Sequence, residues 1–320
     1  MKKDLVFFVN TSEITAGTRG ASLGPGAIMT AVRNKKLTLF NDNPVKYLKE
    51  HNYLLDKPTK YKYAKRIDGL VEVYKELNTE ISDTLKLGNF PIVLAGDHGS
   101  AGGTIAGIKS AFPSKRLGVV WIDAHADMHT PYTTPSGNIH GMPLASALNE
   151  DNTPCANNEI LGETKELWSK LKNIGGISPK ISPQDLVFIA VRDTEEPENA
   201  MLDRLGIKNY TVAEVNEKGE KQVLSEIDQR LSECDLIYVS FDVDSMDPEL
   251  TSHGTGTPVP NGLSIQQAEN LLVGLAKLPK LSSIEFVEVN PCLDEKINKM
   301  GEVAADLLLK VTQNIKLNKE

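Results

Sequence analysis

The sequence predicts a three-layer α/β/α domain built around a central, mostly parallel sheet of about eight strands. Short apolar runs alternate along the chain with longer segments that repeat apolar residues at helical spacing. This alternation is typical of a parallel sheet covered by helices on both faces. The 320 residues, 40% of them hydrophobic, supply enough apolar material for a deep core. No linker divides the chain, so we expect one domain over residues 1–320.

The predicted strands are apolar runs too short for a helix. They are residues 5–9, 37–40, 92–95, 117–122, 186–191, 209–212, 236–241 and 282–287. The predicted helices are residues 65–87, 100–112, 141–148, 220–233, 264–278 and 294–315. The helix at 264–278 begins with Ser264-Ile-Gln-Gln267, the spacing of a capping box. Residues 149–182 follow neither period, and we expect a partly helical surface excursion there.

Composition restricts the classes of function. The net charge of −8 and the pI near 5.4 argue against a nucleic-acid partner, because phosphate binding needs clustered Lys and Arg. The N-terminal apolar run is too short for a signal peptide, and no stretch approaches the ~18 apolar residues of a membrane span. Cys155, Cys234 and Cys292 show no pairing pattern, which indicates reduced thiols. We therefore expect a cytoplasmic protein without a membrane partner.

Histidines and aspartates gather where three predicted strands end. Gly96-Asp-His98, Asp123-Ala-His-Ala-Asp127 and Asp242-Val-Asp244 each follow an apolar run. Side chains at i and i+2 of an extended chain point to one side, and sites in open α/β sheets form at the carboxyl ends of strands. The predicted metal ligands are His98, Asp123, His125, Asp127, Asp242 and Asp244.

Two divalent cations match this ligand set. Four buried aspartates without cations would repel one another, and some would protonate. Carboxylates with two imidazoles and no thiolate suit manganese better than zinc, so we expect two Mn²⁺. Ions ~3.5–4 Å apart would lower the pKa of a shared water towards ~7 and so supply a hydroxide nucleophile. The alternative, aspartates that only cap loops and helix N-termini, fits one such cluster better than three.

Other nucleophile and phosphate-binding motifs are missing from the sequence. There is no Gly-x-Ser-x-Gly elbow. Gly99-Ser-Ala-Gly-Gly103 lacks the Gly-Lys-Ser/Thr of a P-loop, and we expect it to allow close packing of a helix on the sheet.

The three clusters resemble the metal motifs of the ureohydrolase family, which comprises arginases, agmatinases and their relatives. The matching segments are Gly96–His98, Asp123–Asp127 and Ser240-Phe-Asp-Val-Asp-Ser-Met-Asp-Pro248, and they occur in the same order. The resemblance covers most of the chain and is closest to the arginases. It implies an arginase-like fold, two manganese ions bridged by Asp123 and Asp242, and a homo-oligomer, either a trimer or a hexamer.

Two loops resemble the substrate loops of arginases. Residues 130–141, Thr-Pro-Tyr-Thr-Thr-Pro-Ser-Gly-Asn-Ile-His-Gly, imply that Ser136 and Asn138 bind the α-carboxylate of L-arginine. His140 would be the proton shuttle, since an imidazole titrates near neutral pH. Thr255-Gly-Thr-Pro-Val259 implies that Thr255 lies near the guanidino group.

The segment Glu285-Phe-Val-Glu-Val-Asn-Pro291 resembles the arginase Glu-Val-Asn-Pro signature. It implies that Glu288 binds the guanidinium, a planar cation well held by a carboxylate that accepts two parallel hydrogen bonds. The implied reaction converts L-arginine and water to L-ornithine and urea by attack of metal-bound hydroxide. Glu288 would stabilise the tetrahedral intermediate, and Asp127 or His140 would deliver the proton.

Two positions depart from the arginase pattern, and both are expected to contact the substrate. His129 stands where arginases commonly carry Asn, and Glu195 stands where an Asp usually holds the α-amino group. These departures leave open a sister ureohydrolase that acts on agmatine, guanidinobutyrate or formimidoylglutamate. A catalytically silent relative and a single-metal deacetylase-like enzyme remain as alternatives that account less well for six ligands.

Overall fold

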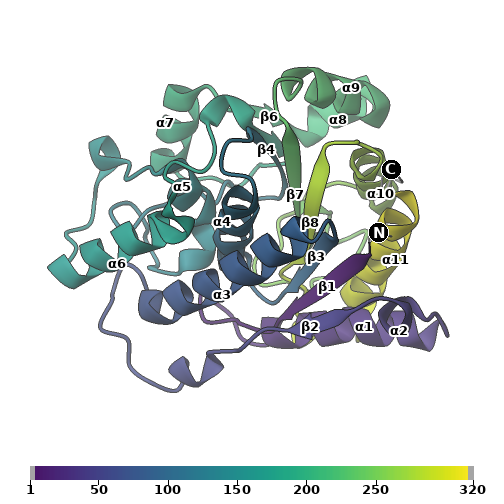
Figure 1. The fold of residues 1–320 in the computed structure, drawn as a ribbon, viewed down its shortest axis with the longest axis horizontal. Helices are drawn as coiled ribbons and strands as arrows, with labels where there is room; N and C mark the ends of the chain where they lie inside the picture. Colours follow the sequence, from purple (N-terminus) through teal and green to yellow (C-terminus); the bar gives the residue numbers. More distant parts are fainter. Residues whose placement is uncertain (1–3, 316–320) are drawn as a thin grey trace.

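The computed structural model describes residues 4–315 and confirms the predicted three-layer fold (Figure 1). Within these residues, eight strands pair in parallel in the order β2-β1-β3-β8-β7-β4-β5-β6. The strands are β1 (Leu5–Asn10), β2 (Val45–Tyr47), β3 (Phe90–Ala95), β4 (Leu117–Ile122), β5 (Leu186–Ile189), β6 (Lys208–Tyr210), β7 (Leu236–Asp242) and β8 (Leu281–Val287).

Helices cover both faces of this sheet, and Figure 1 shows the strands between α10 and α11 on one side and α3 to α6 on the other. One face packs against α1 (Gly24–Asn34), α8 (Val212–Lys218), α9 (Glu220–Arg230), α10 (Ile265–Ala276) and α11 (Lys299–Asn314). The other face packs against α3 (Ile67–Lys86), α4 (Ala101–Ala111), α5 (Pro143–Leu148), α6 (Gly162–Lys172) and α7 (Glu196–Leu205). None of the helices among residues 4–315 has the length and hydropathy needed to cross a membrane.

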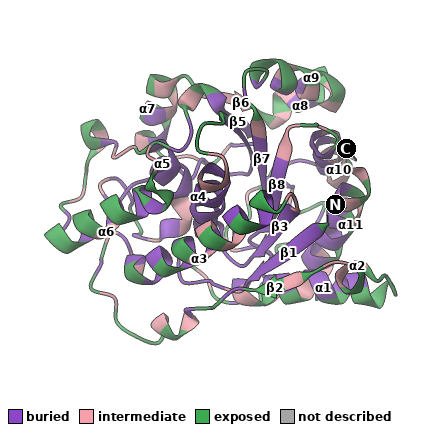
Figure 2. Ribbon diagram, viewed as in Figure 1, coloured by how far each residue is buried: buried purple, intermediate pink, exposed green. Residues whose placement is uncertain are grey.

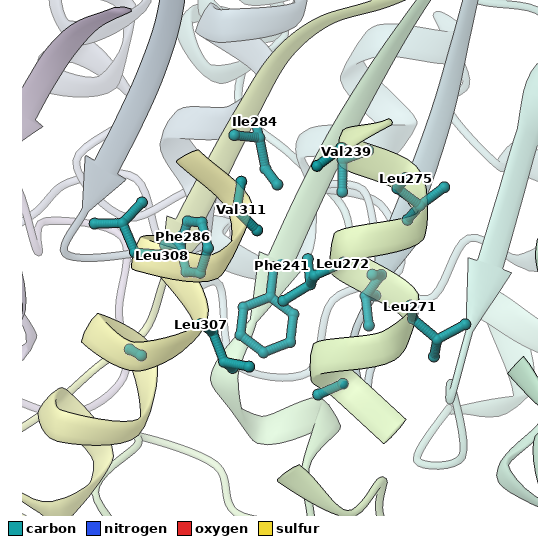
Figure 3. Close-up of a cluster of buried hydrophobic side chains, with 14 of the residues drawn as sticks. Val239, Phe241, Leu271, Leu272, Leu275, Ile284, Phe286, Leu307, Leu308 and Val311 are labelled. Atoms are coloured by element: carbon teal, nitrogen blue, oxygen red, sulfur yellow. The ribbon is translucent and has the colours of Figure 1, made fainter. Parts of the chain in front are cut away.

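The strands are buried on both faces, as a parallel sheet between helices requires. In Figure 2 the central strands are buried along most of their length, whereas exposed residues lie on the outer sides of the helices. Along β7, Val239 and Phe241 enter one core, while Tyr238 enters the other. The Phe241 and Phe286 rings pack edge to face with centroids 5.4 Å apart, beneath leucines of α10 and α11 (Figure 3). Such interlocked rings fix the relative positions of β7 and β8, whose carboxyl ends carry site residues.

The predicted strand at 37–40 is wrong. Leu39–Asp42 forms the single helical turn α2, and the edge strand β2 lies further along the chain. Thr38 Oγ1 donates to Asp42 Oδ2 at 2.6 Å across this turn. Pro44 disfavours helical backbone at the preceding residue, and Asn43 is accordingly extended, so the chain passes from the turn directly into β2.

Besides α2, the helices α1, α7 and α8 are not among the predicted ones. Helix α1 opens with Gly24-Pro25-Gly26, residues that end helices elsewhere but that suit a first turn, where proline loses no hydrogen bond. Within residues 149–182, α6 buries Trp168 and Leu171 in the core that it shares with α3 and α5. The predicted capping box of α10 is confirmed, since Ser264 and Gln267 exchange their hydrogen bonds.

Glycines of α4 allow close packing between two helices, whereas we expected packing of a helix on the sheet. A Cβ atom on Gly103 would lie 3.0 Å from Leu77 Cβ, and one on Gly107 would lie 2.7 Å from Ile81 Cβ. Leu77 and Ile81 belong to α3, so the glycines set the distance between α3 and α4. Because α4 begins just after His98, this packing also positions the start of the site.

Gly107→Ala is expected to destabilise the protein by about 1–3 kcal/mol, because the new methyl overlaps Ile81. The matched control is Gly26→Ala in α1, where an added Cβ meets nothing within 4 Å. That control is expected to gain about 0.5–1 kcal/mol, since alanine loses less backbone entropy on folding. Urea unfolding measures both. Equal stability of the two variants would contradict the packing role of Gly107.

Candidate active site

Four neighbouring central strands bring the site together. In the sheet order β3-β8-β7-β4, all strands are parallel, so their carboxyl ends meet at one edge. His98 follows β3, residues 123–127 follow β4, Asp242 ends β7, and Glu288 follows β8. The six expected metal ligands therefore come to one place from three strands.

The first group of ligands surrounds His98 Nδ1. This atom lies 3.0 Å from Asp123 Oδ2, 3.1 Å from Asp127 Oδ2 and 3.2 Å from Asp242 Oδ2. It is buried and makes no hydrogen bond within residues 4–315. Donor atoms that bind one cation octahedrally at ~2.1 Å lie ~3.0 Å from their neighbours. The spacing and the unpaired nitrogen fit a divalent cation, for which His98, Asp123 and Asp127 form a candidate ligand group.

The second group shares Asp123 with the first. His125 Nδ1 lies 3.1 Å from Asp244 Oδ2 and 3.4 Å from Asp123 Oδ1. These three residues form the other candidate ligand group. Asp123 turns Oδ2 towards the first group and Oδ1 towards the second, which is the placement that a bridging carboxylate needs. Asp242 Oδ1 accepts from the Asp244 backbone N–H at 2.9 Å, while its Oδ2 faces His98.

The two groups perturb one another electrostatically. Burial, followed by repulsion from Asp123, raises the pKa of Asp127 to about 7. Burial and repulsion from Asp244 raise the pKa of Asp242 well above its usual range. Burial alone would lower the pKa of His98, but the three aspartate carboxylates around Nδ1 raise it well above the ordinary value. A site that holds protons this tightly has the negative charge to hold cations in their place.

Two residues that support His98 are absent from the predicted site. Ser240 Oγ lies 2.7 Å from His98 Nε2, and the Trp121 ring stacks on the imidazole at 4.0 Å. Trp121 Nε1 also donates to Asp123 Oδ2 at 2.9 Å. Ser240 lies two residues before Asp242, and Trp121 lies two residues before Asp123. The period of two that identified the expected ligands therefore also indicated these two residues. Such contacts orient ligands and fix which imidazole nitrogen binds.

A cavity opens above the ligands and carries most of the expected substrate residues. Its lining comprises His98, His125, Asp127, His129, Thr134, Pro135, Ser136, Asn138, His140, Gly141, Asp193, Thr194, Glu195, Glu198, Asp242, Asp244 and Thr257. Ser136 and Asn138 form one part of the lining, and the Asn138 backbone N–H donates to Ser136 Oγ at 3.1 Å.

His129 lies among carboxylates elsewhere in the lining. Its Nε2 is 3.6 Å from Glu195 Oε2 and 3.4 Å from Glu198 Oε2. Glu198 is buried at the start of α7, where it accepts from the Met128 backbone N–H at 3.1 Å and completes a capping box with Glu195. Burial raises the pKa of Glu198 to about 7. Glu198 is a lining residue that was not predicted, and its Glu195-x-x-Glu198 spacing was the available signal.

His140, Glu288 and Thr255 differ in their access to the cavity. His140 lines it, with Nδ1 3.4 Å from Glu288 Oε1. Glu288 lies behind His140, buried, and its Oε1 accepts from the His98 backbone N–H at 2.9 Å. Burial would raise the pKa of Glu288, but the contacts with His140 and with the His98 amide lower it. Thr255 is buried outside the lining, whereas Thr257, which was not predicted, lines the cavity and donates to Asp244 Oδ2 at 3.2 Å.

Comparison with known proteins gives consistent matches over most of the chain. The family described as "Arginase family" matches residues 3–313. An arginase from Brevibacillus brevis is 35% identical over 317 residues, covering 97% of this chain and 98% of the relative. An arginase from Bacillus caldovelox is 39% identical over 245 residues, covering 76% and 75%. The crystal structure of arginase from Bacillus subtilis superposes with a TM-score of 0.82 at 32% identity, covering 99% of each chain.

Glu198→Gln is expected to flatten the dependence of stability on pH. The pKa of Glu198 is about 7 in the folded protein against 4.5 in a free side chain. As the pH rises from about 4.5 to 7, the unfolded chain releases this proton while the folded chain keeps it, so the free energy of unfolding falls. The loss amounts to at most about 3 kcal/mol.

Urea unfolding of metal-free protein at pH 5 and pH 8 measures this effect. The variant is expected to lose about 2 kcal/mol less than the wild type between the two pH values. Glu196→Gln, on the exposed side of the same helical turn, serves as the control and is expected to match the wild type. An unchanged slope in Glu198→Gln would show that this carboxyl does not titrate in the window.

Proposed function

Since this chain belongs to the arginase family, we propose that it hydrolyses L-arginine to L-ornithine and urea. The observation that carries the proposal is the division of one cavity into two parts. Its base holds the candidate metal-ligand groups, and its lining offers hydrogen-bond donors on Ser136 and Asn138 and carboxylates at the start of α7. A guanidinium at the base and a zwitterionic head group at the lining would match both parts.

Two manganese ions are proposed at the base, held by His98, Asp123, His125, Asp127, Asp242 and Asp244. The oxygen-rich donor set and the shared Asp123 carboxylate support this assignment. When bound, such ions act as Lewis acids and lower the pKa of a coordinated water towards neutrality. Ser240 and Trp121 would hold the His98 ring in its binding orientation.

Glu288 is proposed to hold the guanidinium carbon in place for attack. Its Oε1 is occupied by the His98 amide, and a Cβ on Gly256 would lie 3.7 Å from its Oε2, so this second oxygen faces the loop that carries Thr255 and Thr257. A carboxylate with a lowered pKa stays ionised and can pair with a cation. Thr255 would support this loop from its buried position, and Thr257 would be the threonine that faces the substrate.

The head group is proposed to bind between the donors and the carboxylates. Ser136 Oγ accepts from the Asn138 backbone, which leaves the hydroxyl hydrogen free to donate. Ser136 and the Asn138 amide would donate to the α-carboxylate, whereas Glu195 would accept from the α-ammonium. His129 would complete this ring of contacts beside Glu195.

His140 is proposed to deliver the proton to the departing amine, with Asp127 as the other proton carrier. Burial would lower the pKa of His140, but the neighbouring Glu288 carboxylate raises it above its ordinary value. A histidine that lines the cavity and stays protonated near neutral pH can act as a general acid. We also propose a cytoplasmic location, and the family resemblance supports a homo-oligomer, a trimer or a hexamer, as the working form.

A sister ureohydrolase is the second candidate, and one observation favours it. His129 places an imidazole beside Glu195 and Glu198, where it competes with a substrate ammonium for the same oxygens. A guanidino compound without an α-amino group, such as guanidinobutyrate, would avoid that competition.

Manganese-loaded protein is expected to release urea from L-arginine with a kcat/KM at least ~100-fold above that for agmatine or guanidinobutyrate, because only arginine offers both charges of the head group. A colorimetric urea assay over this panel, repeated after EDTA treatment and with cobalt or zinc supplied, measures it. A higher kcat/KM for agmatine or guanidinobutyrate would replace the proposed substrate.

His140→Asn is expected to lower kcat about 100-fold while KM changes less than about threefold, because the substrate still binds but loses its proton donor. The pH profile of kcat should also lose one limb. His253→Asn, an exposed histidine outside the cavity lining, is the control and should keep wild-type kinetics. A wild-type kcat in His140→Asn would remove this residue from the proton path.

A further inference from the structure

We propose that Lys65 determines specificity for substrates that carry an α-carboxylate. It would do so by orienting the Asn138 amide and by adding a positive charge behind the carboxylate-binding side of the cavity. The inference rests on the proposed function and deepens it, since it identifies the group that separates arginine from agmatine.

Lys65 contacts the loop of Ser136 and Asn138 from behind. Its backbone N–H donates to the Gly137 carbonyl at 2.8 Å, and its Nζ donates to Asn138 Oδ1 at 3.2 Å. Gly137 has a φ of +76°, and a Cβ there would lie 2.0 Å from the Lys62 carbonyl oxygen. Residues 62–65 and the loop are therefore packed too closely to shift independently, which holds the ammonium against Asn138.

The contact with Lys65 fixes which end of the Asn138 amide faces the substrate. An ammonium only donates, so Asn138 must turn Oδ1 towards it and present its NH₂ group elsewhere. A Cβ on Gly17 would lie 2.9 Å from Asn138 Nδ2, so the absence of a side chain at residue 17 keeps the space beside that donor open. The Ser136 hydroxyl is also left as a donor, so the two side chains of the loop both offer donors, which suits a carboxylate.

The charge of Lys65 matters because the cavity itself is acidic. No lysine or arginine of residues 4–315 lines it, whereas Asp193, Glu195 and Glu198 do. The negative charges of these side chains would repel a substrate carboxylate. Within the same residues Lys65 forms no ion pair, so its charge is available to polarise the Asn138 amide and to attract the carboxylate through it.

Lys65→Met tests the proposal, because it keeps the length of the side chain and the backbone contact but removes the charge and the donor. The KM for L-arginine is expected to rise about tenfold with kcat unchanged, whereas KM and kcat for agmatine stay within twofold. Lys65→Arg should restore most of the arginine affinity. Lys62→Met, an exposed lysine on the same segment, is the control and should match the wild type.

Calorimetric binding of L-ornithine and of 1,4-diaminobutane to manganese-loaded protein provides a readout independent of turnover. Lys65→Met should weaken ornithine about tenfold and leave the diamine unchanged. The role of Lys65 is overturned if the wild type prefers arginine but Lys65→Met lowers the affinity for arginine and agmatine equally, or changes neither affinity. In both cases the proposed function stands.

If the wild type does not hydrolyse arginine, yet binds ornithine in a manner that depends on Lys65, the proposed function fails and the role of Lys65 stands. A wild type that binds ornithine no better than the diamine overturns the role of Lys65, and the urea assay alone then decides the proposed function.

Discussion

The buried carboxylates around His98 can stay ionised only if positive charge lies among them, and this constraint governs the rest of the site. Asp123, Asp127 and Asp242 each place an oxygen within 3.2 Å of one imidazole nitrogen. Without cations the cluster holds protons, which burial and mutual repulsion bind tightly. Divalent ions would replace those protons and add the free energy of metal binding to that of folding. The sheet beneath must then be rigid enough to keep the oxygens together before any ion arrives.

The backbone around the cluster shows how this rigidity is achieved. Asp127 and Glu288 have φ values of +51° and +66°, a left-handed conformation that costs roughly 1–3 kcal/mol in such residues. Surrounding contacts hold them there. Elsewhere beside the cluster, Arg192 donates to the carbonyl oxygens of Asp244 at 2.9 Å and Val259 at 2.6 Å, which joins a candidate metal ligand to the loop that contains Thr257. Arg192 therefore holds one end of the candidate metal centre and the Thr257 loop in a fixed relation to each other.

The sequence predicted those parts of the molecule that depend on local periodicity. Ligands such as Asp123 and His125 follow buried strands at a spacing of two, and parallel strands bring their carboxyl ends together, so the cluster followed from pattern alone. The helical turn at Leu39–Asp42 was not predicted, because four residues of mixed polarity fit either a strand or a turn. Pro44 favours the turn, since it disfavours helical backbone at Asn43 and so ends the helix there. Lys65 and Asn138 meet across 73 positions of sequence through side chains. No periodicity signals such a contact, since it depends on how two loops pack.

The two carboxylates at the start of α7, Glu195 and Glu198, differ in their hydrogen bonds. Glu198 uses both oxygens on backbone amides, Oε1 on Met128 and Oε2 on Glu195, so it ties α7 to the loop of metal ligands. Glu195 is exposed at the N-cap of α7. Its extra methylene, compared with aspartate, lets the oxygens reach His129 at 3.6 Å without leaving the cap. The Glu195 and Glu198 carboxylates thus face the same imidazole of His129, at 3.6 and 3.4 Å, so the three side chains form one electrostatic unit in the cavity lining.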